Sequence, residues 1–521
     1  MKQRITHVVD RADRVDDSQI KVSNNALEYQ GASAIEKRVT VGLDELPIEL
    51  LEFFSVIHEL HIRWTARLGY QSTSPFISRL PPGLHIFFTP GRTDQEVDIC
   101  PGLRQIFGDI RCNSTLDSFS KPEILSKRFS SASTFQYYSP YPKILTFQSF
   151  LAKKVCQEFE GDCVNEVASL AFASSIDINY DVISHAVSFT AFWRSSVQSP
   201  AARTPARKWK NGDSVEVGVL HEEDPAAYEP EELKFGGYLT VIGEDTKPRG
   251  TLFSFPARHH HASLPDRPRL PEATYKVAFQ QPNGLHPKLD ITFPNVKALT
   301  PPKEACALHA YLTLPSTLFI DRYQLSDALF LASQNLVALH SLSGEQDLEA
   351  PDWVIKRWGS AALFELALPS FMAEYSQPDN DKVASAPWTV TIPTHLRYLQ
   401  APPNNTTPGL RELDIPWPTV FWACEAEDGL KMSTNPFDRV NLGYDGLFGP
   451  KTMFYHFRFE GEEGAVLLER LHVPVLEPEN AKWLQLGTLI TVMLGLGWVL
   501  WTLFRPIPTG TKAKPTANKM E

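Results

Sequence analysis

The chain has 521 residues, of which 43% are hydrophobic and 21% charged, with 61 acidic against 50 basic side chains. This length corresponds to about two or three domains, and the apolar fraction is sufficient for folded cores. The net charge of −11 argues against a nucleic-acid-binding protein, which would show a basic face. The 41 prolines favour short strands and irregular loops over long helices.

The first half of the chain mixes helix and strand signals. Apolar side chains recur at three- and four-residue steps over residues 50–68, which predicts a helix. Alternation over residues 187–193 predicts a strand. The runs "YLTVI" and "TLFSF" flank the loop 243–250 and predict a hairpin. We therefore predict a mixed α+β region at residues 1–255.

The second half has a stronger β pattern. Residues 256–272, "PARHHHASLPDRPRLPE", have the proline and charge content of a linker. Residues 275–279 and 289–293 then alternate on either side of the turn Asn283-Gly284. Further strand candidates are Leu308–Leu314, Ala361–Leu368, Trp388–Ile392, Thr419–Cys424 and Met453–Phe459. These short strands predict a mainly-β, antiparallel sandwich-like domain at residues 273–480.

An uncharged stretch of 22 residues, 483–504, precedes the C-terminal tail. As a helix it reaches about 33 Å, enough to cross a hydrocarbon core of about 30 Å. We predict a transmembrane helix here and a separate tail at residues 505–521. Gly487, Thr491 and Gly495 recur every four residues and would form a packing face for another helix, with contact to lipid as an equal alternative.

Two interpretations of the orientation remain open. The N-terminus lacks the apolar run of a signal peptide, so by default the span would be a tail anchor with the bulk of the chain in the cytosol. However, residues 505–521 carry four basic side chains, against Arg470 and Lys482 before the span. Since basic residues collect on the cytosolic side, this count places the tail in the cytosol and the bulk in the lumen.

Glycosylation signals favour the second interpretation weakly. Asn113, Asn404 and Asn405 each begin an N-x-[ST] acceptor triplet. The last two lie in the loop-like run "APPNNTTPG", although triplets of this kind also occur by chance.

The six cysteines show no C-x2-C spacing, which disfavours a structural zinc site and a redox motif. One interpretation is six buried free thiols. The other, in an oxidising compartment, is a set of disulfides with 15 full pairings. Pairing of near neighbours would give Cys100–Cys112 and Cys156–Cys163, and would leave Cys306–Cys424.

Catalytic signatures are weak. The run His58–His61 resembles a zincin motif, but its second histidine comes one residue early, so these are more simply rim residues of the predicted helix. His259–His261 could bind metals, yet in a linker a solvated loop is the simpler interpretation. Asp379-Asn380-Asp381 matches the Asp-x-Asp of metal-dependent glycosyltransferases, in a run typical of an exposed loop. We expect no catalytic residues, no metal and no cofactor.

Five segments, taken in order, resemble the PIG-X family, whose fungal members are the protease-B-nonderepressible proteins. They are "PNGLHPKL" (Pro282–Leu289), "LPSTLFIDRYQL" (Leu314–Leu325), "DLEAPDW" (Asp347–Trp353), "VTIPTHLRYL" (Val390–Leu399) and "PWPTVFWAC" (Pro416–Cys424). The likeness covers about residues 270–475 and the span, whereas residues 1–255 resemble the extra N-terminal part of the fungal members only.

The resemblance implies an endoplasmic-reticulum membrane glycoprotein with a lumenal body and one C-terminal span. Its implied role is the non-catalytic subunit that stabilises the multispan mannosyltransferase adding the first mannose to the GPI-anchor precursor. A membrane-anchored lumenal chaperone for several proteins is the alternative, and a glycosyltransferase using Asp379 and Asp381 is a third.

A lumenal body also favours disulfides, with Cys306–Cys424 as the long-range pair. The polar runs His395–Tyr398 and Asp321–Tyr323 each end an apolar segment. We expect them either to cap a sheet or to contact a partner.

Overall fold

The structure is a computed structural model. It describes residues 1–9, 15–91, 97–122, 134–140, 144–156, 162–194, 206–208, 212–223, 231–262, 272–303, 305–369, 387–400, 409–426, 435–437, 443–476 and 478–505. The chain divides into two compact units, of which the first comprises Met1–Tyr398 with Leu413–Leu471. The second comprises Leu399–Glu412 with His472–Glu521.

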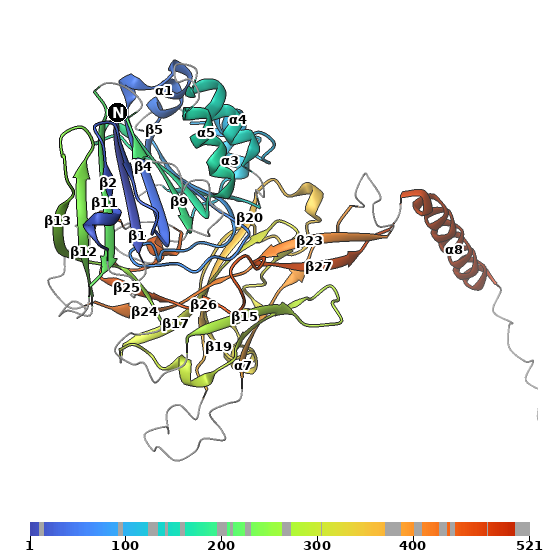
Figure 1. Ribbon diagram of the computed structural model, residues 1–521. Helices are drawn as coiled ribbons and strands as arrows, with labels where there is room; N and C mark the ends of the chain where they lie inside the picture. The colour runs from blue at the N-terminus through green and yellow to red at the C-terminus, as the bar shows by residue number, and fades with distance from the viewer. Residues whose placement is uncertain are drawn as a thin grey trace, which may run out of the picture. The chain divides into compact units, whose positions relative to one another are not determined.

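A large sheet forms the N-terminal part of the first unit (Figure 1). Its ten strands, in spatial order, are β13 (Arg249–Pro256), β12 (Glu232–Val241), β11 (Ser214–Glu222), β1 (Lys2–Val9), β4 (Ala34–Gly42), β9 (Ala186–Arg194), β8 (Ser175–Asp181), β5 (Ile57–Thr65), β6 (Gly83–Pro90) and β7 (Phe135–Ser139). The pair β1–β11 is parallel and the other pairs are antiparallel. A smaller sheet contains β10 (Ala206–Arg207), β3 (Ala26–Glu28) and β2 (Lys21–Val22).

Short helices lie on one side of the large sheet (Figure 1). They are α1 (Ile48–Ser55), α2 (Cys100–Phe107), α3 (Thr115–Ser118), α4 (Leu145–Lys154) and α5 (Asp162–Ser169). The described residues of the first unit also include the 3-10 helices η1 (Asp17–Gln19), η2 (Leu43–Glu45), η5 (Leu170–Phe172), η6 (Val296–Leu299), η7 (Gln324–Ser326), η8 (Asp352–Val354) and η11 (Gly443–Leu447).

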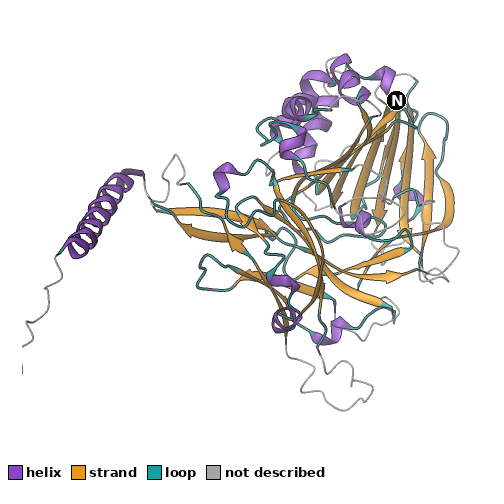
Figure 2. Ribbon diagram, turned by 180° about the vertical axis from the view of Figure 1, so that it is seen from behind, coloured by secondary structure: helices purple, strands orange, loops and turns teal. Residues whose placement is uncertain are grey.

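The remainder of the first unit is mainly strand (Figure 2). A six-stranded sheet has the order β14 (His259–His261), β25 (Thr452–His456), β24 (Thr419–Glu425), β17 (Cys306–Pro315), β20 (Gly359–Leu366) and β19 (Leu336–Gly344). A four-stranded sheet has the order β21 (Trp388–Pro393), β16 (Lys288–Phe293), β15 (Thr274–Phe279) and β26 (Arg458–Phe459). This unit also contains β18 (Leu318–Phe319) paired with β22 (His395–Leu396), and α7 (Ala328–Ser333). The pair β23 (Leu410–Pro416) and β27 (Leu468–Pro474) includes residues of both units, and α8 (Pro478–Phe504) belongs to the second.

The predicted fold class is confirmed: a mixed N-terminal region precedes a mainly-β region and one C-terminal apolar helix. The hairpin around loop 243–250 is the antiparallel pair β12–β13. The turn at Asn283-Gly284 joins the antiparallel pair β15–β16. In each case a local alternation of apolar residues ends at a turn signal, so the hairpin is specified within one short segment.

The predicted helix over residues 50–68 is wrong beyond its first two turns. Helix α1 ends at Ser55, and β5 begins at Ile57. All residues from Leu60 to Thr65 are buried, because β5 lies between β6 and β8 in the large sheet and is covered on both faces. The apolar run fits both a helical and a strand period, and the pairing of neighbouring strands decides between them.

The three histidines 259–261 are not a solvated loop, and this prediction is also wrong. They form β14, which pairs in parallel with β25. The ring of His259 is fully enclosed, with its Nδ1 2.9 Å from His456 Nε2 and its Nε2 3.3 Å from Asp445 Oδ2. The first residues of the predicted linker 256–272 are therefore part of a sheet, and residues 263–271 lie outside the described residues. The domain division itself stays a prediction.

The two predicted regions share one hydrophobic core. It joins Ile86 and Tyr137 of the large sheet to Tyr311, Leu363 and Phe421 of the six-stranded sheet. The Gln136 side-chain amide donates to the Tyr311 hydroxyl oxygen at 2.9 Å. The Trp358 indole N–H donates to the Gln136 carbonyl at 3.1 Å. These polar contacts satisfy buried groups and hold the two sheets in one arrangement.

Three disulfides join the six cysteines: Cys100–Cys112, Cys156–Cys163 and Cys306–Cys424. Cys306 and Cys424 lie directly opposite each other on β17 and β24, with Cα atoms 4.3 Å apart. This is the spacing of a close antiparallel pair, in which side chains meet across the ladder.

We predict that the long-range disulfide contributes more stability than a short-range one. Cys306–Cys424 closes a separation of 118 residues and Cys156–Cys163 a separation of seven. In the chain-entropy description the longer loop is worth about 2.5 kcal/mol more. The unfolding midpoint should therefore fall further in Cys306→Ser/Cys424→Ser than in the matched control Cys156→Ser/Cys163→Ser, as measured by thermal unfolding. Equal losses, or unchanged gel mobility of the wild type on reduction, would contradict this expectation.

Candidate functional site

Four of the five segments that carry the family resemblance lie against one another in the first unit. We call residues 282–289, 314–325, 347–353 and 390–398 the motif cluster. Within it β18 pairs with β22, which places Phe319 opposite His395. The Leu396 N–H donates to the Leu285 carbonyl at 2.8 Å, and the Asp352 N–H donates to the Tyr398 carbonyl at 3.1 Å. Segments far apart in the chain are thus joined by backbone hydrogen bonds at one place.

Arg397 is the buried centre of the motif cluster, with only 3% of its surface exposed. Its guanidinium lies 4.5 Å from the centroid of the Phe319 ring, and its Nη1 donates to the Ala350 carbonyl at 2.8 Å. Burial lowers the pKa of Arg397, and nearby carboxylates including Asp352 partly offset this effect. The side chain therefore fastens three segments by stacking and hydrogen bonding. Of the two expected roles, Arg397 has the structural one.

Exposed aromatic side chains lie on the same cluster. Tyr323 is 72% exposed, Trp353 52% and Tyr398 65%. We call these three residues the aromatic rim. Tyr398 directly follows the buried Arg397 in sequence, and Trp353 follows Asp352, whose carboxylate accepts a hydrogen bond from Ser316 Oγ at 2.6 Å. Aromatic residues held on a fixed backbone are enriched in protein interfaces, because they bury much surface at little entropic cost.

A pair of histidines also belongs to the motif cluster. The Nδ1 atoms of His286 and His395 are 2.7 Å apart, and the His395 ring stacks on Phe319. Burial and the neighbouring His286 lower the pKa of His395. One imidazole must donate and the other accept, so this contact is lost when both rings are protonated.

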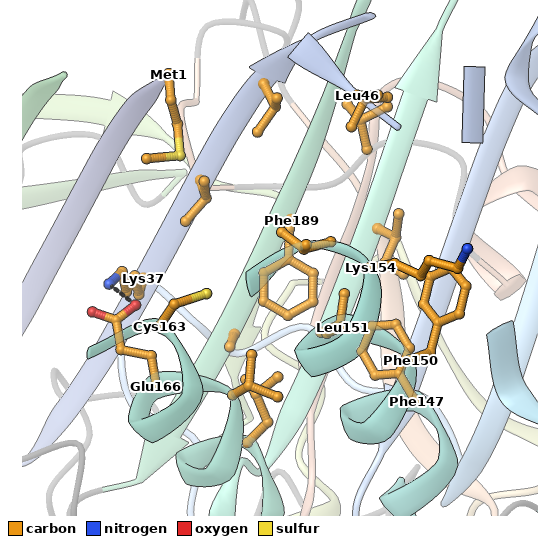
Figure 3. A pocket seen from close by; sticks show the side chains of 18 of the residues that line it. Met1, Lys37, Leu46, Phe147, Phe150, Leu151, Lys154, Cys163, Glu166 and Phe189 are labelled. Carbon is orange, nitrogen blue, oxygen red and sulfur yellow. Dashed lines mark ion pairs between the residues drawn. The ribbon is translucent and has the colours of Figure 1, made fainter. Parts of the chain in front are cut away.

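A cavity of about 550 Å³ lies between the helices and the large sheet (Figure 3). This volume is within the range of small-molecule sites. Most of its wall is apolar: the sheet supplies Ile5, Val39, Phe189 and Trp193, and the helices supply Phe53 and Phe150. Figure 3 shows Phe147, Phe150 and Leu151 of α4 on one side and the ion pair of Lys37 with Glu166 on the other.

Lys37 is a charged side chain on a mostly apolar sheet face. It lies opposite Ile5 on β1 and Ala191 on β9, and its Nζ is 2.6 Å from Glu166 Oε2 on α5. Burial lowers the pKa of Lys37, while the Glu166 carboxylate acts in the opposite direction. His7, also in the wall, has its pKa lowered to about 4 by burial and is therefore neutral at pH 7. The cavity thus suits a largely apolar group, and Lys154 adds a further charged side chain to its wall.

Three residues of the six-stranded sheet could hold a metal ion. The ligand atoms of His309, His340 and Glu365 lie within 4.8 Å of one another. No local spacing signals this group, because its members come from separate strands. A signal did exist for Lys37, since it is the charged member of the alternation Ile35, Lys37, Val39 on β4.

The residues that the sequence singled out as candidate sites do not come together at one place in the described part of the chain. His58–His61 lie on β5 rather than on a helix, so they lack the helical geometry that the zincin motif needs. Asn113 is exposed and lies two residues before the start of α3. Asn404, Asn405 and the triplet 379–381 lie outside the described residues.

In the second unit, α8 contains a stretch, Asn480–Phe504, that is long and apolar enough to span a membrane, with mean hydropathy 1.8. The Thr491 hydroxyl donates to the Gly487 carbonyl at 2.9 Å, which satisfies its polar group within the helix. Gly487, Thr491 and Gly495 follow one another at four-residue steps on this helix. That these three residues form a packing face for another helix stays a prediction.

We predict that Lys37 and Glu166, which are partly buried, contribute to the free energy of unfolding as a coupled pair. Lys37→Met or Glu166→Met alone leaves a charge in the cavity wall without this partner and should cost about 1–3 kcal/mol. The double variant should recover most of the loss, because two apolar side chains suit the wall. A double-mutant cycle on unfolding measures the coupling.

The control is the ion pair of Lys154 with Glu49, which has a similar separation of 2.7 Å but is much more exposed. Its coupling should be clearly smaller, because water screens it. Equal coupling in the two cycles would show that burial does not matter for the first pair.

Comparison with known proteins places the chain in a family. A family model described as PIG-X / PBN1 matches residues 282–504. The chain is 44% identical to "Protein pbn1" of Emericella nidulans, over 96% of this chain and 95% of the relative. It is 42% identical to that of Aspergillus oryzae over 96% of each chain, and 40% identical to that of Neurospora crassa over 97% of this chain and 95% of the relative. The similarity includes the N-terminal region as well as the motif cluster and α8, and the chain therefore belongs to the PIG-X / PBN1 family.

Proposed function

We propose that this protein is the non-catalytic, stabilising subunit of the mannosyltransferase that adds the first mannose to the GPI-anchor precursor. Membership of the PIG-X / PBN1 family, over nearly the whole chain, is the observation that carries the proposal. The motif cluster supports it, since its buried side chains fasten four segments while its aromatic rim faces outward. A multispan catalytic subunit in the endoplasmic-reticulum membrane is the proposed partner.

We also propose that the body is lumenal and the tail cytosolic. The basic residues of 505–521 support this orientation. The three disulfides support it independently, because disulfides persist in an oxidising lumen and are rare in the cytosol.

The apolar cavity favours a second candidate function, a membrane-anchored lumenal chaperone. A chaperone needs an apolar surface that accepts segments of many clients. The two functions differ in stoichiometry: a subunit purifies one to one with a single multispan partner, whereas a chaperone purifies with many clients at low occupancy.

We predict that removal of the aromatic rim weakens the catalytic complex without unfolding the protein. In Tyr323→Ser/Trp353→Ser/Tyr398→Ser, the amount of catalytic subunit that co-purifies should fall about tenfold or more. Thermal stability should stay unchanged, because the three side chains are exposed. Quantitative co-purification from microsomes measures the first effect and thermal unfolding the second.

Two further variants make this result specific. Phe172→Ser/Ile183→Ser removes comparably exposed apolar side chains elsewhere and should leave the complex intact. Arg397→Ala should lower both stability and complex recovery, since it removes the buried centre of the cluster. Normal recovery in the rim variant would exclude the rim as the contact surface.

We predict that glycans are attached to the body. Endoglycosidase treatment of the microsomal protein should increase its gel mobility, and the shift should be absent in Asn113→Gln/Asn404→Gln/Asn405→Gln. Because unused acceptors would also give no shift, protease protection in sealed microsomes is the second measurement. Digestion of the body from the outside would contradict the lumenal orientation.

A further inference from the structure

Two histidines and a glutamate converge on one face of the six-stranded sheet. His309 is on β17, Glu365 on β20 and His340 on β19, and these are three adjacent strands. His309 lies directly opposite Glu365 in the antiparallel register. Since all three side chains come from paired strands rather than loops, their positions are held by the backbone ladder.

An irregularity in β19 brings the third side chain to this face. Leu339 pairs with Phe364 and Ser341 with Leu363, so the register shifts at His340, which is the extra residue. The His340 Nε2 then lies 2.6 Å from Glu365 Oε2. A β-bulge is a common way to redirect one side chain, and bulges are frequent beside functional sites.

The ring of His309 is oriented as in a metal-bound histidine. Its Nδ1 is 3.0 Å from the Ala307 carbonyl, an acceptor, so Nδ1 carries the hydrogen and Nε2 keeps its lone pair. The ring stacks against Phe421 and meets Phe448 edge to face. A backbone carbonyl on the second nitrogen is the usual outer contact of histidine ligands, because it fixes the tautomer and the ring plane.

The site is also accessible. The His340 side chain is 37% exposed and Glu365 is partly exposed, whereas His309 is buried. A cation could therefore enter from solvent, and water could complete its coordination. Two imidazoles and one carboxylate with an open fourth position form a ligand set that suits Zn²⁺.

We propose that His309, His340 and Glu365 form a Zn²⁺ site on the six-stranded sheet. Tetrahedral ligands of Zn²⁺ are about 3.4 Å apart, whereas the three ligand atoms here lie within 4.8 Å of one another. A small rotation of the exposed His340 side chain would bring the three atoms to the distances that Zn²⁺ needs. A histidine that binds a metal through Nε2 carries its hydrogen on Nδ1, so on binding the hydrogen between His340 Nε2 and Glu365 Oε2 is lost to solvent while Nδ1 takes one up, and both freed atoms bond to the metal. The site does not depend on the proposed role in the mannosyltransferase.

The test uses the full-length protein in detergent, without a polyhistidine tag, after removal of metals with a chelator. We expect titration with ZnCl₂ to show one high-affinity site per chain. Co²⁺ should give the visible absorption bands of a four-coordinate N/O site. His340→Ala and Glu365→Gln should each weaken Zn²⁺ binding by about thirtyfold or more, since each removes one of three protein ligands.

The controls separate this site from adventitious binding and from unfolding. His286→Ala breaks a close histidine pair elsewhere in the first unit, that of His286 with His395, and should leave Zn²⁺ affinity unchanged. His340 is exposed and Glu365→Gln keeps the side-chain shape, so both variants should retain the thermal unfolding midpoint of the metal-free wild type. Absence of one-to-one binding in the wild type, or wild-type affinity in both variants, would overturn the proposal and leave a plain histidine–glutamate hydrogen bond.

Discussion

Strand β17 is the element on which the rest of the first unit depends. It pairs with β20 on one side and β24 on the other, so its backbone hydrogen bonds are satisfied within the sheet. Its Tyr311 hydroxyl accepts the hydrogen bond from Gln136 of the large sheet. Its first residue, Cys306, is covalently joined to β24, and the chain continues from its end into the motif cluster. A shift of this strand would therefore disturb the shared core, the disulfide and the motif cluster together.

In the motif cluster, buried residues hold the backbone in place and exposed residues are available for contact with a partner. Arg397 and Asp352 are buried and make contacts that hold separate segments at fixed positions. The aromatic side chains next to them in sequence, Tyr398 and Trp353, are exposed on that fixed backbone. An aromatic side chain on a rigid element loses little entropy on binding, which is why such an arrangement suits the contact of a stabilising subunit with its partner.

In the cavity under the helices, by contrast, a polar pair lies in a wall where apolar side chains would be more stable. The cavity wall is mostly apolar, and partly burying an ion pair there is unfavourable compared with apolar side chains of similar size. Lys37 and Glu166 are held together from a strand and a helix, so the pair also links these two layers. Small-molecule sites commonly combine a largely apolar wall with a few polar groups, and this cavity has that character.

Much of the fold was predictable from the sequence where the signal is local. The hairpins β12–β13 and β15–β16 each need only an alternating run and a turn, and the span Asn480–Phe504 needs only length and absence of charge. The resemblance likewise depended on short segments in a set order. Such features are encoded by neighbouring residues and do not require knowledge of the rest of the chain.

Only the tertiary structure decided the features that depend on distant partners. Residues 57–65 are a strand because β6 and β8 pair with them, although their apolar spacing also fits a helix. His259 is buried because β25, Asp445 and His456 enclose a run that looks like a linker. The motif cluster, the Lys37–Glu166 pair and the group of His309, His340 and Glu365 all join side chains from separate elements. Contacts between residues far apart in the chain produce no periodic pattern in the sequence. The entropy lost on closing the long loops and the free energy gained by packing both arise only when the sheets come together.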